Sequence, residues 1–214
     1  MDDAETEPKW RRRADERPDE VLDAALKMFA RNGFAATKVE DIASEAGLSK
    51  GAIYRYFSSK EDIFESLVNR AIAPMAERTL ELVETSNEDP EKLLRAIFSV
   101  ITMRLSDPLT LALPRVVLQE AGRFPHLAET YRRQVLDKGI AAFEMIVKRG
   151  IETGHFRPVN ARLAIRNVLG PMLAHFILGQ IFQIDRDAPV STEEFLESHL
   201  DILMNGLLKP QTGD

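Results

Sequence analysis

Apolar residues recur at intervals of three and four positions along almost the whole of this chain of 214 residues. That interval is the repeat of an α-helix with one buried face, whereas the period of two that marks a half-buried strand is lacking. The sequence therefore predicts an all-α fold. The expected helices cover about 18–32, 38–46, 49–57, 58–83, 91–106, 109–122, 126–153, 160–184 and 192–208.

Capping sequences indicate where several of these helices begin. Thr37 with Glu40 and Ser191 with Glu194 match the capping box, in which a hydroxyl and a carboxylate satisfy backbone N–H groups at a helix start. A further box at 58–61 opens a helix that the apolar spacing continues to about residue 83. A single long helix is thus expected to follow the N-terminal helices.

Composition excludes several classes of protein. Cysteine is absent, so disulfides and thiolate metal sites cannot form, and a reducing, cytoplasmic location is expected. Residues 1–20 are charged almost throughout, so we expect no secretory signal there. Residues 167–184 carry no charge but include glycine, proline and several polar side chains, so we expect a buried helix there and no membrane span. The net charge of −6 means that any nucleic-acid interface must depend on local charge.

Residues 47–51 read GLSKG and satisfy the G-x-S-x-G pattern of serine hydrolases. The nucleophilic serine of those enzymes follows a strand of a parallel sheet, whereas the segment before Gly47 is expected to be helical. A helix, a glycine turn, a polar cap and a second short helix instead describe a helix-turn-helix. Gly47 then supplies the positive φ of the turn, and Ser49 caps the second helix through its hydroxyl group.

The second helix of this pair has a positive surface although the whole chain is acidic. No acidic residue occurs within 48–59. Small residues at the helix start allow a close approach to base edges, and tyrosine hydroxyls can donate hydrogen bonds to phosphates. These features belong to Gly51 and Ala52, to Tyr54 and Tyr56, and to the cations Lys50, Arg55 and Lys60. A merely solvated surface is the alternative for the three cations.

The segment TKVEDIASEAGLSKGAIYRYFSSKEDIFESL, residues 37–67, resembles the DNA-binding region of the TetR family of bacterial transcriptional regulators. The preceding VLDAALKMFARNGFAAT is similar to the first helix of that family. Many positions agree in order, so this resemblance is more specific than one short pattern. It implies an N-terminal three-helix domain with the helix-turn-helix, followed by a C-terminal helical domain for ligand binding and dimerisation. Residues 118–156 resemble the C-terminal region of the AefR-like group.

Residues 1–17 mix acidic and basic side chains and are expected to be a mobile tail. The resemblance divides the rest into a DNA-binding domain at 18–60 and a ligand-binding and dimerisation domain at 61–214. Pro18 suits the first turn of the first helix, because its missing N–H is harmless there. The arginines at 11–13 could follow a phosphate strand, as basic arms do, although the acids beside them oppose that contact.

The resemblance also implies roles for single residues in binding a double-stranded DNA operator. Thr37 would hold a phosphate at the start of the second helix, and Lys60 would do so at the start of the fourth. The beginning of the recognition helix would face bases, the tyrosines would meet phosphates, and Arg55 would touch either. The DNA-binding residues predicted are Thr37, Lys38, Ser49, Lys50, Gly51, Ala52, Tyr54, Arg55, Tyr56 and Lys60.

The last two helices are too apolar for the surface of a monomer. Residues 168–182 are apolar on nearly every side, and 192–208 carry a broad apolar face. Such helices need neighbours on two sides, and pairing both with their copies would make a four-helix bundle with two-fold symmetry. We therefore expect a homodimer through 160–184 and 192–208, with its recognition helices about 34 Å apart.

A small-molecule ligand is expected in the C-terminal domain, but the sequence indicates its site less directly. The candidates combine large apolar side chains with polar groups inside apolar runs: Phe98, Met103, Arg115, Gln119, Phe143, Met172, His175 and Phe176. Methionine and phenylalanine at helical spacing are by default core residues, and a lone histidine on an apolar helix is most often a core or interface residue. Pro171 removes a backbone hydrogen bond and is expected to kink its helix. No cofactor or metal is expected, because Glu152 and His155 match only half of a carboxylate-bridged metal pattern.

Together these features predict a homodimeric repressor that leaves a near-palindromic operator when a small hydrophobic or amphipathic molecule binds. An activator, or a regulator controlled by a protein partner, is the first alternative. An all-α enzyme is the second, although the sequence contains no catalytic constellation, phosphate loop or dinucleotide-binding pattern. DNA binding whose affinity falls steeply with salt would separate a regulator from an enzyme.

Overall fold

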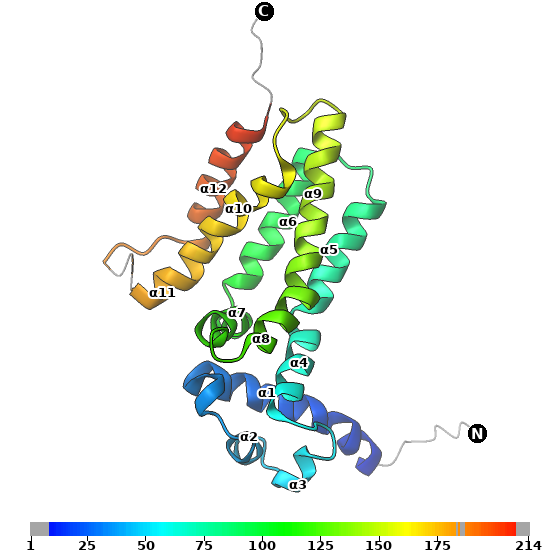
Figure 1. Ribbon diagram of the computed structural model, residues 1–214, viewed down its shortest axis with the longest axis vertical. Coiled ribbons are helices and arrows are strands. Elements are labelled where there is room, and N and C mark those ends of the chain that lie inside the picture. The colour runs from blue at the N-terminus through cyan, green and yellow to red at the C-terminus, as the bar shows by residue number, and fades with distance from the viewer. Residues whose placement is uncertain (1–8, 183, 185–186, 209–214) are drawn as a thin grey trace, which may run out of the picture. The chain divides into compact units, whose positions relative to one another are not determined.

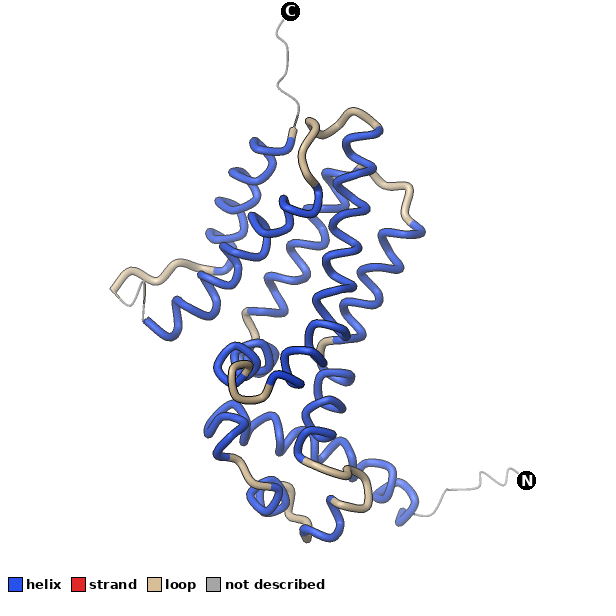
Figure 2. Tube along the Cα trace, in the orientation of Figure 1, coloured by secondary structure: helices blue, strands red, loops and turns tan. Residues whose placement is uncertain are grey.

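The structure is a computed structural model that describes residues 9–182, 184 and 187–208 (Figure 1). Every regular element within these residues is a helix, as Figure 2 shows, so the predicted all-α fold is confirmed. Backbone contacts divide the chain into two compact units. The first comprises Met1–Arg70 and Ala112–Thr130, and the second comprises Ala71–Leu111 and Tyr131–Asp214.

The first unit is built around an aromatic core. Its helices are α1 (Lys9–Ala36), α2 (Val39–Glu45), α3 (Lys50–Ile53), α4 (Lys60–Ala71), most of α7 (Pro108–Glu120) and α8 (Pro125–Tyr131). Phe34 is fully buried, and its ring centroid lies 5.2 Å from that of Phe29 and 5.8 Å from that of Phe64. The ring of Phe124, between α7 and α8, packs edge-on against Phe34 at 5.1 Å. Tilted and edge-on ring pairs stabilise a core beyond the apolar area that they bury.

Helix α1 begins earlier than the sequence predicts. Its backbone is helical from Lys9, and Pro18, the expected first turn, lies inside it. Residues 1–8 lie outside the described residues, so the mobility of the tail at 1–17 stays a prediction. The predicted stop at Gly33 is present as a kink, because Gly33 takes a φ of +76° that residues with a Cβ rarely adopt.

The prediction of a single long helix at 58–83 is wrong, because the structure has two helices there. α4 ends at Ala71, and α5 (Ala73–Thr85) follows a break at Ile72, whose φ is −125°. Pro74 explains the break, since it lacks the N–H of the helical hydrogen bond and its ring opposes the carbonyl four residues earlier. The apolar spacing continues across the break and therefore does not reveal it.

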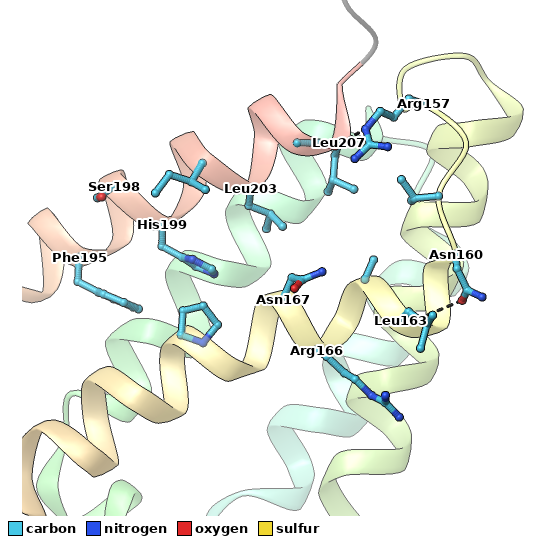
Figure 3. Close-up of a pocket in the computed structure, with 15 residues that line it drawn as sticks. Arg157, Asn160, Leu163, Arg166, Asn167, Phe195, Ser198, His199, Leu203 and Leu207 are labelled. Carbon is cyan, nitrogen blue, oxygen red and sulfur yellow. Dashed lines mark hydrogen bonds between the residues drawn. The ribbon is translucent and has the colours of Figure 1, made fainter.

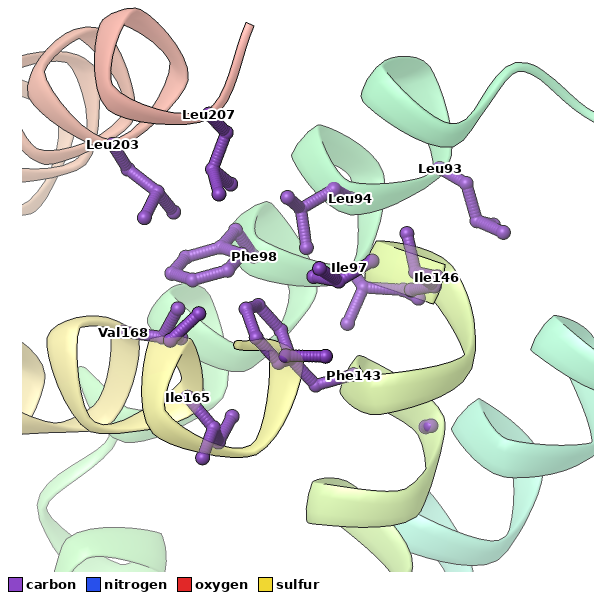
Figure 4. Packing of buried hydrophobic residues seen from close by; sticks show 14 of the residues in the cluster. Leu93, Leu94, Ile97, Phe98, Phe143, Ile146, Ile165, Val168, Leu203 and Leu207 are labelled. Carbon is purple, nitrogen blue, oxygen red and sulfur yellow. The ribbon is translucent and has the colours of Figure 1, made fainter. Parts of the chain in front are cut away.

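The second unit packs longer helices around one apolar core. They are α5, α6 (Pro90–Leu105), the start of α7, η1 (Arg132–Leu136), α9 (Asp137–Glu152), α10 (Ala161–Leu173), η2 (Ala174–Leu178), α11 (Gly179–Phe182) and α12 (Thr192–Leu207). α9 contacts α5, α6 and α10, while α12 lies along α6 and α10. Figure 4 shows Phe98 of α6 close to Phe143 of α9, beside Val168 of α10.

Two π-helical turns lie within helices that the sequence predicts as regular. η1 joins α8 to α9, and η2 joins α10 to α11. Pro171 lies inside α10, and the wider turn η2 begins three residues after it, at Ala174. The predicted capping box of Ser191 and Glu194 is confirmed at the start of α12.

Gly150 of α9 lies directly against the ring of Phe156, which is fully buried. A Cβ added at Gly150 would lie 2.1 Å from Cδ2 of Phe156. Gly150→Ala is therefore expected to lower the free energy of unfolding by about 2 kcal/mol, because the ring must shift within a packed core. Urea unfolding followed by circular dichroism measures this change.

Gly139→Ala is the matched control. Gly139 lies in the same helix, and a Cβ added there would meet nothing within 4 Å. We expect it to raise the free energy of unfolding by up to about 1 kcal/mol, because alanine favours helices over glycine. Equal stability of the two variants would contradict the close approach of Phe156 to Gly150.

Candidate nucleic-acid interface

The turn between α2 and α3 has the geometry that the sequence predicts. Gly47 adopts a φ of +67°, and the N–H of Leu48 donates a hydrogen bond to the carbonyl of Ala43 at 2.9 Å. Ser49 caps α3, since its Oγ accepts the N–H of Ala52 at 3.2 Å. The cap and the turn are thus confirmed. Ser49 follows the helix α2, whereas the nucleophilic serine of a hydrolase follows a strand.

Helix α3 is a single turn, shorter than the helix predicted to about residue 57. The N–H groups of Tyr56 and Phe57 both donate to the carbonyl of Ile53, which closes a tight turn after the helix. Lys50, Gly51, Tyr54 and Arg55 are exposed, Ala52 and Tyr56 are half-buried, and Ile53 is fully buried. The surface predicted to meet DNA is therefore open to solvent, while Ile53 anchors it in the core.

Lys50, the first residue of α3, forms an ion pair with Glu40 of α2. Its Nζ donates a hydrogen bond to Oε1 of Glu40 at 2.5 Å. This hydrogen bond lowers the pKa of Glu40 and raises the pKa of Lys50, so both groups are charged at neutral pH. The same Nζ lies 5.7 Å from the ring centroid of Tyr54. Spacing within the recognition segment does not reveal this pair, because Glu40 belongs to the preceding helix.

Thr37 does not have the position that its predicted phosphate contact requires. Its side chain is fully buried, and its Oγ1 donates a hydrogen bond to the carbonyl of Gly33 at 2.7 Å. Lys38 caps α2, and its N–H donates to Oδ2 of Asp41 at 2.9 Å. The predicted box of Thr37 with Glu40 is therefore one residue out of register. Lys38 itself is exposed at the edge of the interface.

Lys60 binds the end of α1, a structural role that the sequence does not reveal, while its contact with a phosphate stays a prediction. Its Nζ donates hydrogen bonds to the carbonyls of Phe34 at 2.7 Å and Thr37 at 2.9 Å. Burial lowers the pKa of Lys60. Glu120 of α7 acts on the same segment, because its Oε1 accepts the N–H of Ala35 at 3.0 Å. The lysine satisfies carbonyls at the C-terminal end of α1, where a cation is favourable, and the carboxylate of Glu120 satisfies an N–H just after the kink at Gly33.

Lys60→Met is expected to lower the free energy of unfolding of the first unit by about 2 kcal/mol, since hydrogen bonds from a charged group are lost. Chemical denaturation followed by near-ultraviolet circular dichroism measures the loss. Lys38→Met, at an exposed site, should change the free energy of unfolding by less than about 0.5 kcal/mol. A Lys60 variant of unchanged stability whose DNA affinity depends less on salt would favour the phosphate role.

A groove of about 680 Å³ lies between α10 and α12 (Figure 3). Leu163 and Ile202 line it and are apolar yet 51% and 70% exposed. His199 also lines the groove but is only 8% exposed, and its Nε2 has no hydrogen-bond partner among the described residues. Burial lowers the pKa of His199, and a hydrogen bond to the backbone of Val168, which by itself raises the pKa, only partly opposes this effect.

The apolar residues predicted to bind a ligand are core residues. Phe98, Phe143 and Met172 are buried together in the main core of the second unit. Phe176 is buried in a smaller cluster of the same unit. Helical spacing marks the buried face of a helix without distinguishing a filled core from a cavity, so the sequence cannot separate the two uses.

The other four residues predicted to bind a ligand lie outside these two buried clusters. Met103 is exposed, and Arg115 and Gln119 belong to the first unit. His175 stacks on Phe195, with ring centroids 4.1 Å apart. None of the eight predicted residues lines the groove between α10 and α12. No sequence pattern singles out His199 there, because it lies on an apolar face like any interface histidine.

The described residues contain no cluster suited to a metal ion and no single helix suited to crossing a membrane. No three side chains of the metal-binding types come together within them. No single helix among them has the length and hydropathy to cross a bilayer, although α6 and α7 taken together across their bend meet that test.

Comparison with known proteins assigns both parts of the chain. Residues 21–67 match the bacterial regulatory proteins of the tetR family, and residues 87–192 match the tetracyclin repressor-like C-terminal domain. The HTH-type transcriptional repressor KstR2 of Mycolicibacterium smegmatis is 26% identical over 200 residues, which are 91% of this chain and 92% of KstR2. Neither family match singles out the AefR-like group.

Two solved structures share the fold. FadR from Bacillus subtilis in complex with stearoyl-CoA has a TM-score of 0.71 and 24% identity, covering 88% of this chain and 98% of FadR. The SmeT–triclosan complex has a TM-score of 0.77 and 21% identity, covering 92% of this chain and 94% of SmeT. On these matches the chain belongs to the TetR family of bacterial regulatory proteins, which are DNA-binding transcriptional regulators and not enzymes.

Proposed function

We propose that this regulator is a homodimeric repressor that a hydrophobic or amphipathic small molecule releases from a near-palindromic operator. The observation that carries the proposal is the capped α3, whose exposed residues Lys50, Tyr54 and Arg55 lie in a segment without acidic residues. Lysine and arginine donate to base edges, and tyrosine hydroxyls donate to phosphates. This surface suits the major groove.

The proposed dimer forms through α10, α11 and α12. Leu163, Leu173 and Ile202 are exposed apolar residues on two of these helices, and monomers seldom expose such surfaces in one place. The helices of a second copy would cover the groove between α10 and α12. A two-fold dimer would present its recognition helices to half-sites about 34 Å apart.

The sign of regulation and the class of ligand are proposed from relatives. KstR2 is named a repressor, FadR is described with stearoyl-CoA, and SmeT is described with triclosan. Both molecules carry a large apolar part and a polar group. They agree with the hydrophobic or amphipathic ligand expected from the sequence, and the second unit holds a large apolar core that could accommodate one after rearrangement.

Selection from a random-sequence duplex library tests the DNA-binding part. The protein is first unfolded and refolded so that any bound ligand is removed. We expect a near-palindrome to be enriched, with an affinity whose logarithm falls against the logarithm of salt concentration by about 0.9 for each phosphate contacted. Refolded protein that enriches no sequence at low salt would contradict the proposal.

Titration with stearoyl-CoA and with triclosan tests the release step. Each is expected to weaken binding to the selected operator, and operator DNA must weaken binding of the same molecule by an equal factor. Operator affinity that neither molecule changes would favour the alternative, a regulator controlled by a protein partner. Loss of transcription on deletion of the gene would identify an activator.

A further inference from the structure

The ion pair of Glu40 and Lys50 lies on the surface that is proposed to meet DNA. Lys50 begins α3 and Glu40 lies in the first turn of α2, so the pair joins the starts of the two helices. Both side chains are about half-exposed, at 53% and 51%. The carboxylate of Glu40 balances the charge of Lys50 by direct contact.

The hydrogen bond to Glu40 uses one of the three N–H donors of the lysine ammonium group. Two donors remain, and a guanine edge offers two acceptors, O6 and N7, in the major groove. Without Glu40 the ammonium group would be a freely rotating point charge. The carboxylate therefore orients Lys50 for the kind of contact that distinguishes one base from another.

The carboxylate also changes what else Lys50 can bind. A phosphate attracts a lysine mainly through net charge, whereas a base edge attracts it through hydrogen bonds. A paired Lys50 has its charge balanced at close range, so the pair weakens contacts with phosphates more than contacts with bases. Contacts with phosphates occur on any DNA sequence, and contacts with bases occur only at the operator.

We infer that Glu40 is a specificity-determining residue, which stays paired with Lys50 on DNA, orients it toward a guanine and keeps it from neighbouring phosphates. Glu40 acts through Lys50 and is thus a positioning residue. The inference rests on the proposed DNA-binding function and deepens it, because it names the residue that limits binding to unrelated sequences.

Glu40→Gln tests the role of the charge, since glutamine keeps an acceptor of the same reach but removes the negative charge. We expect the affinity for a scrambled duplex to rise by up to about eightfold at about 0.1 M salt for each Lys50 whose charge is no longer balanced, because one more phosphate is neutralised. The salt dependence for that duplex should steepen by about 0.9 for each lysine. The affinity for the selected operator should change less. The ratio of operator affinity to scrambled-duplex affinity is therefore expected to fall.

Glu45→Gln is the matched control, because it removes an acid from the same helix. Glu45 pairs with Lys27 and Arg31, both at 3.8 Å, and does not contact Lys50. Glu45→Gln should leave the salt dependence of DNA binding, and the ratio of operator affinity to scrambled-duplex affinity, as they are in the unchanged protein. Lys50→Ala alone should remove base preference at one position of the operator. When Glu40→Gln is added to Lys50→Ala, the ratio of operator affinity to scrambled-duplex affinity should not change further.

Three results would overturn the inference. Glu40→Gln with unchanged ratio and salt dependence would show that the pair has no influence on DNA binding. A Glu40→Gln effect that persists in the Lys50→Ala background would show that Glu40 contacts DNA by itself. If the unchanged protein selects no operator, the proposed function fails and this inference fails with it, whereas the first two results leave the proposed function intact.

Discussion

Ile202→Arg is expected to convert the proposed dimer into a monomer. The side chain is 70% exposed and apolar, and it lines the groove between α10 and α12. A two-fold interface repeats each residue, so one substitution introduces two arginines into the covered surface. Loss of a central apolar contact and burial of charge should raise the dimer dissociation constant at least about 100-fold.

Sedimentation equilibrium measures that constant, and gel mobility shift measures the consequence for DNA. We expect operator affinity to fall by at least about 100-fold, since a monomer contacts one half-site and loses the effective concentration of the second. Leu82→Arg is the control, because Leu82 is also an exposed apolar residue of the second unit but lies on α5. An Ile202→Arg protein that stays dimeric would exclude this face as the interface.

Phe34→Ala is expected to have the largest effect on stability. The ring is fully buried among Phe29, Phe64 and Phe124, and Nζ of Lys60 lies 4.3 Å from its centroid. Removing a buried phenylalanine ring leaves a cavity and costs about 4 kcal/mol. A domain of this size has little more stability than that, so the first unit should be largely unfolded near body temperature.

Thermal unfolding followed by circular dichroism and by calorimetry measures the change. Because the chain forms two units, Phe34→Ala should move the transition of the first unit and leave a second transition in place. Leu118→Ala, an exposed apolar position in the same unit, should change the free energy of unfolding by less than about 0.5 kcal/mol. A Phe34→Ala protein with a single transition at the unchanged temperature would contradict the aromatic core.

Local sequence was enough to predict the helix-turn-helix. The positive φ of Gly47 and the cap of Ser49 on α3 depend on neighbours within a few residues, and both are present. The same holds for the box of Ser191 and Glu194 at α12. Such features are predictable because the backbone groups that they satisfy lie within one turn of the residue concerned.

Features that depend on distant partners were not predictable in this way. Lys60 looks like a surface cation in the sequence, but the folded chain places it against carbonyls of residues 34–37. Thr37 is a local exception: it resembles a cap and a phosphate ligand, yet its hydroxyl group donates to the carbonyl of Gly33, only four residues away, where the helix is kinked. The sequence marks Glu40 only as a capping residue, and its pairing with Lys50 follows from the angle between two helices.

Helix α7 starts at Pro108 in the second unit and ends at Glu120 in the first. Its far end supplies the carboxylate that holds Ala35, and Phe124 just beyond it closes the aromatic core around Phe34. A fragment ending at residue 70 would lack both. The DNA-reading part of this regulator is therefore not an exchangeable module, and a chimera that grafts it onto another sensor must carry residues 112–130 along with it.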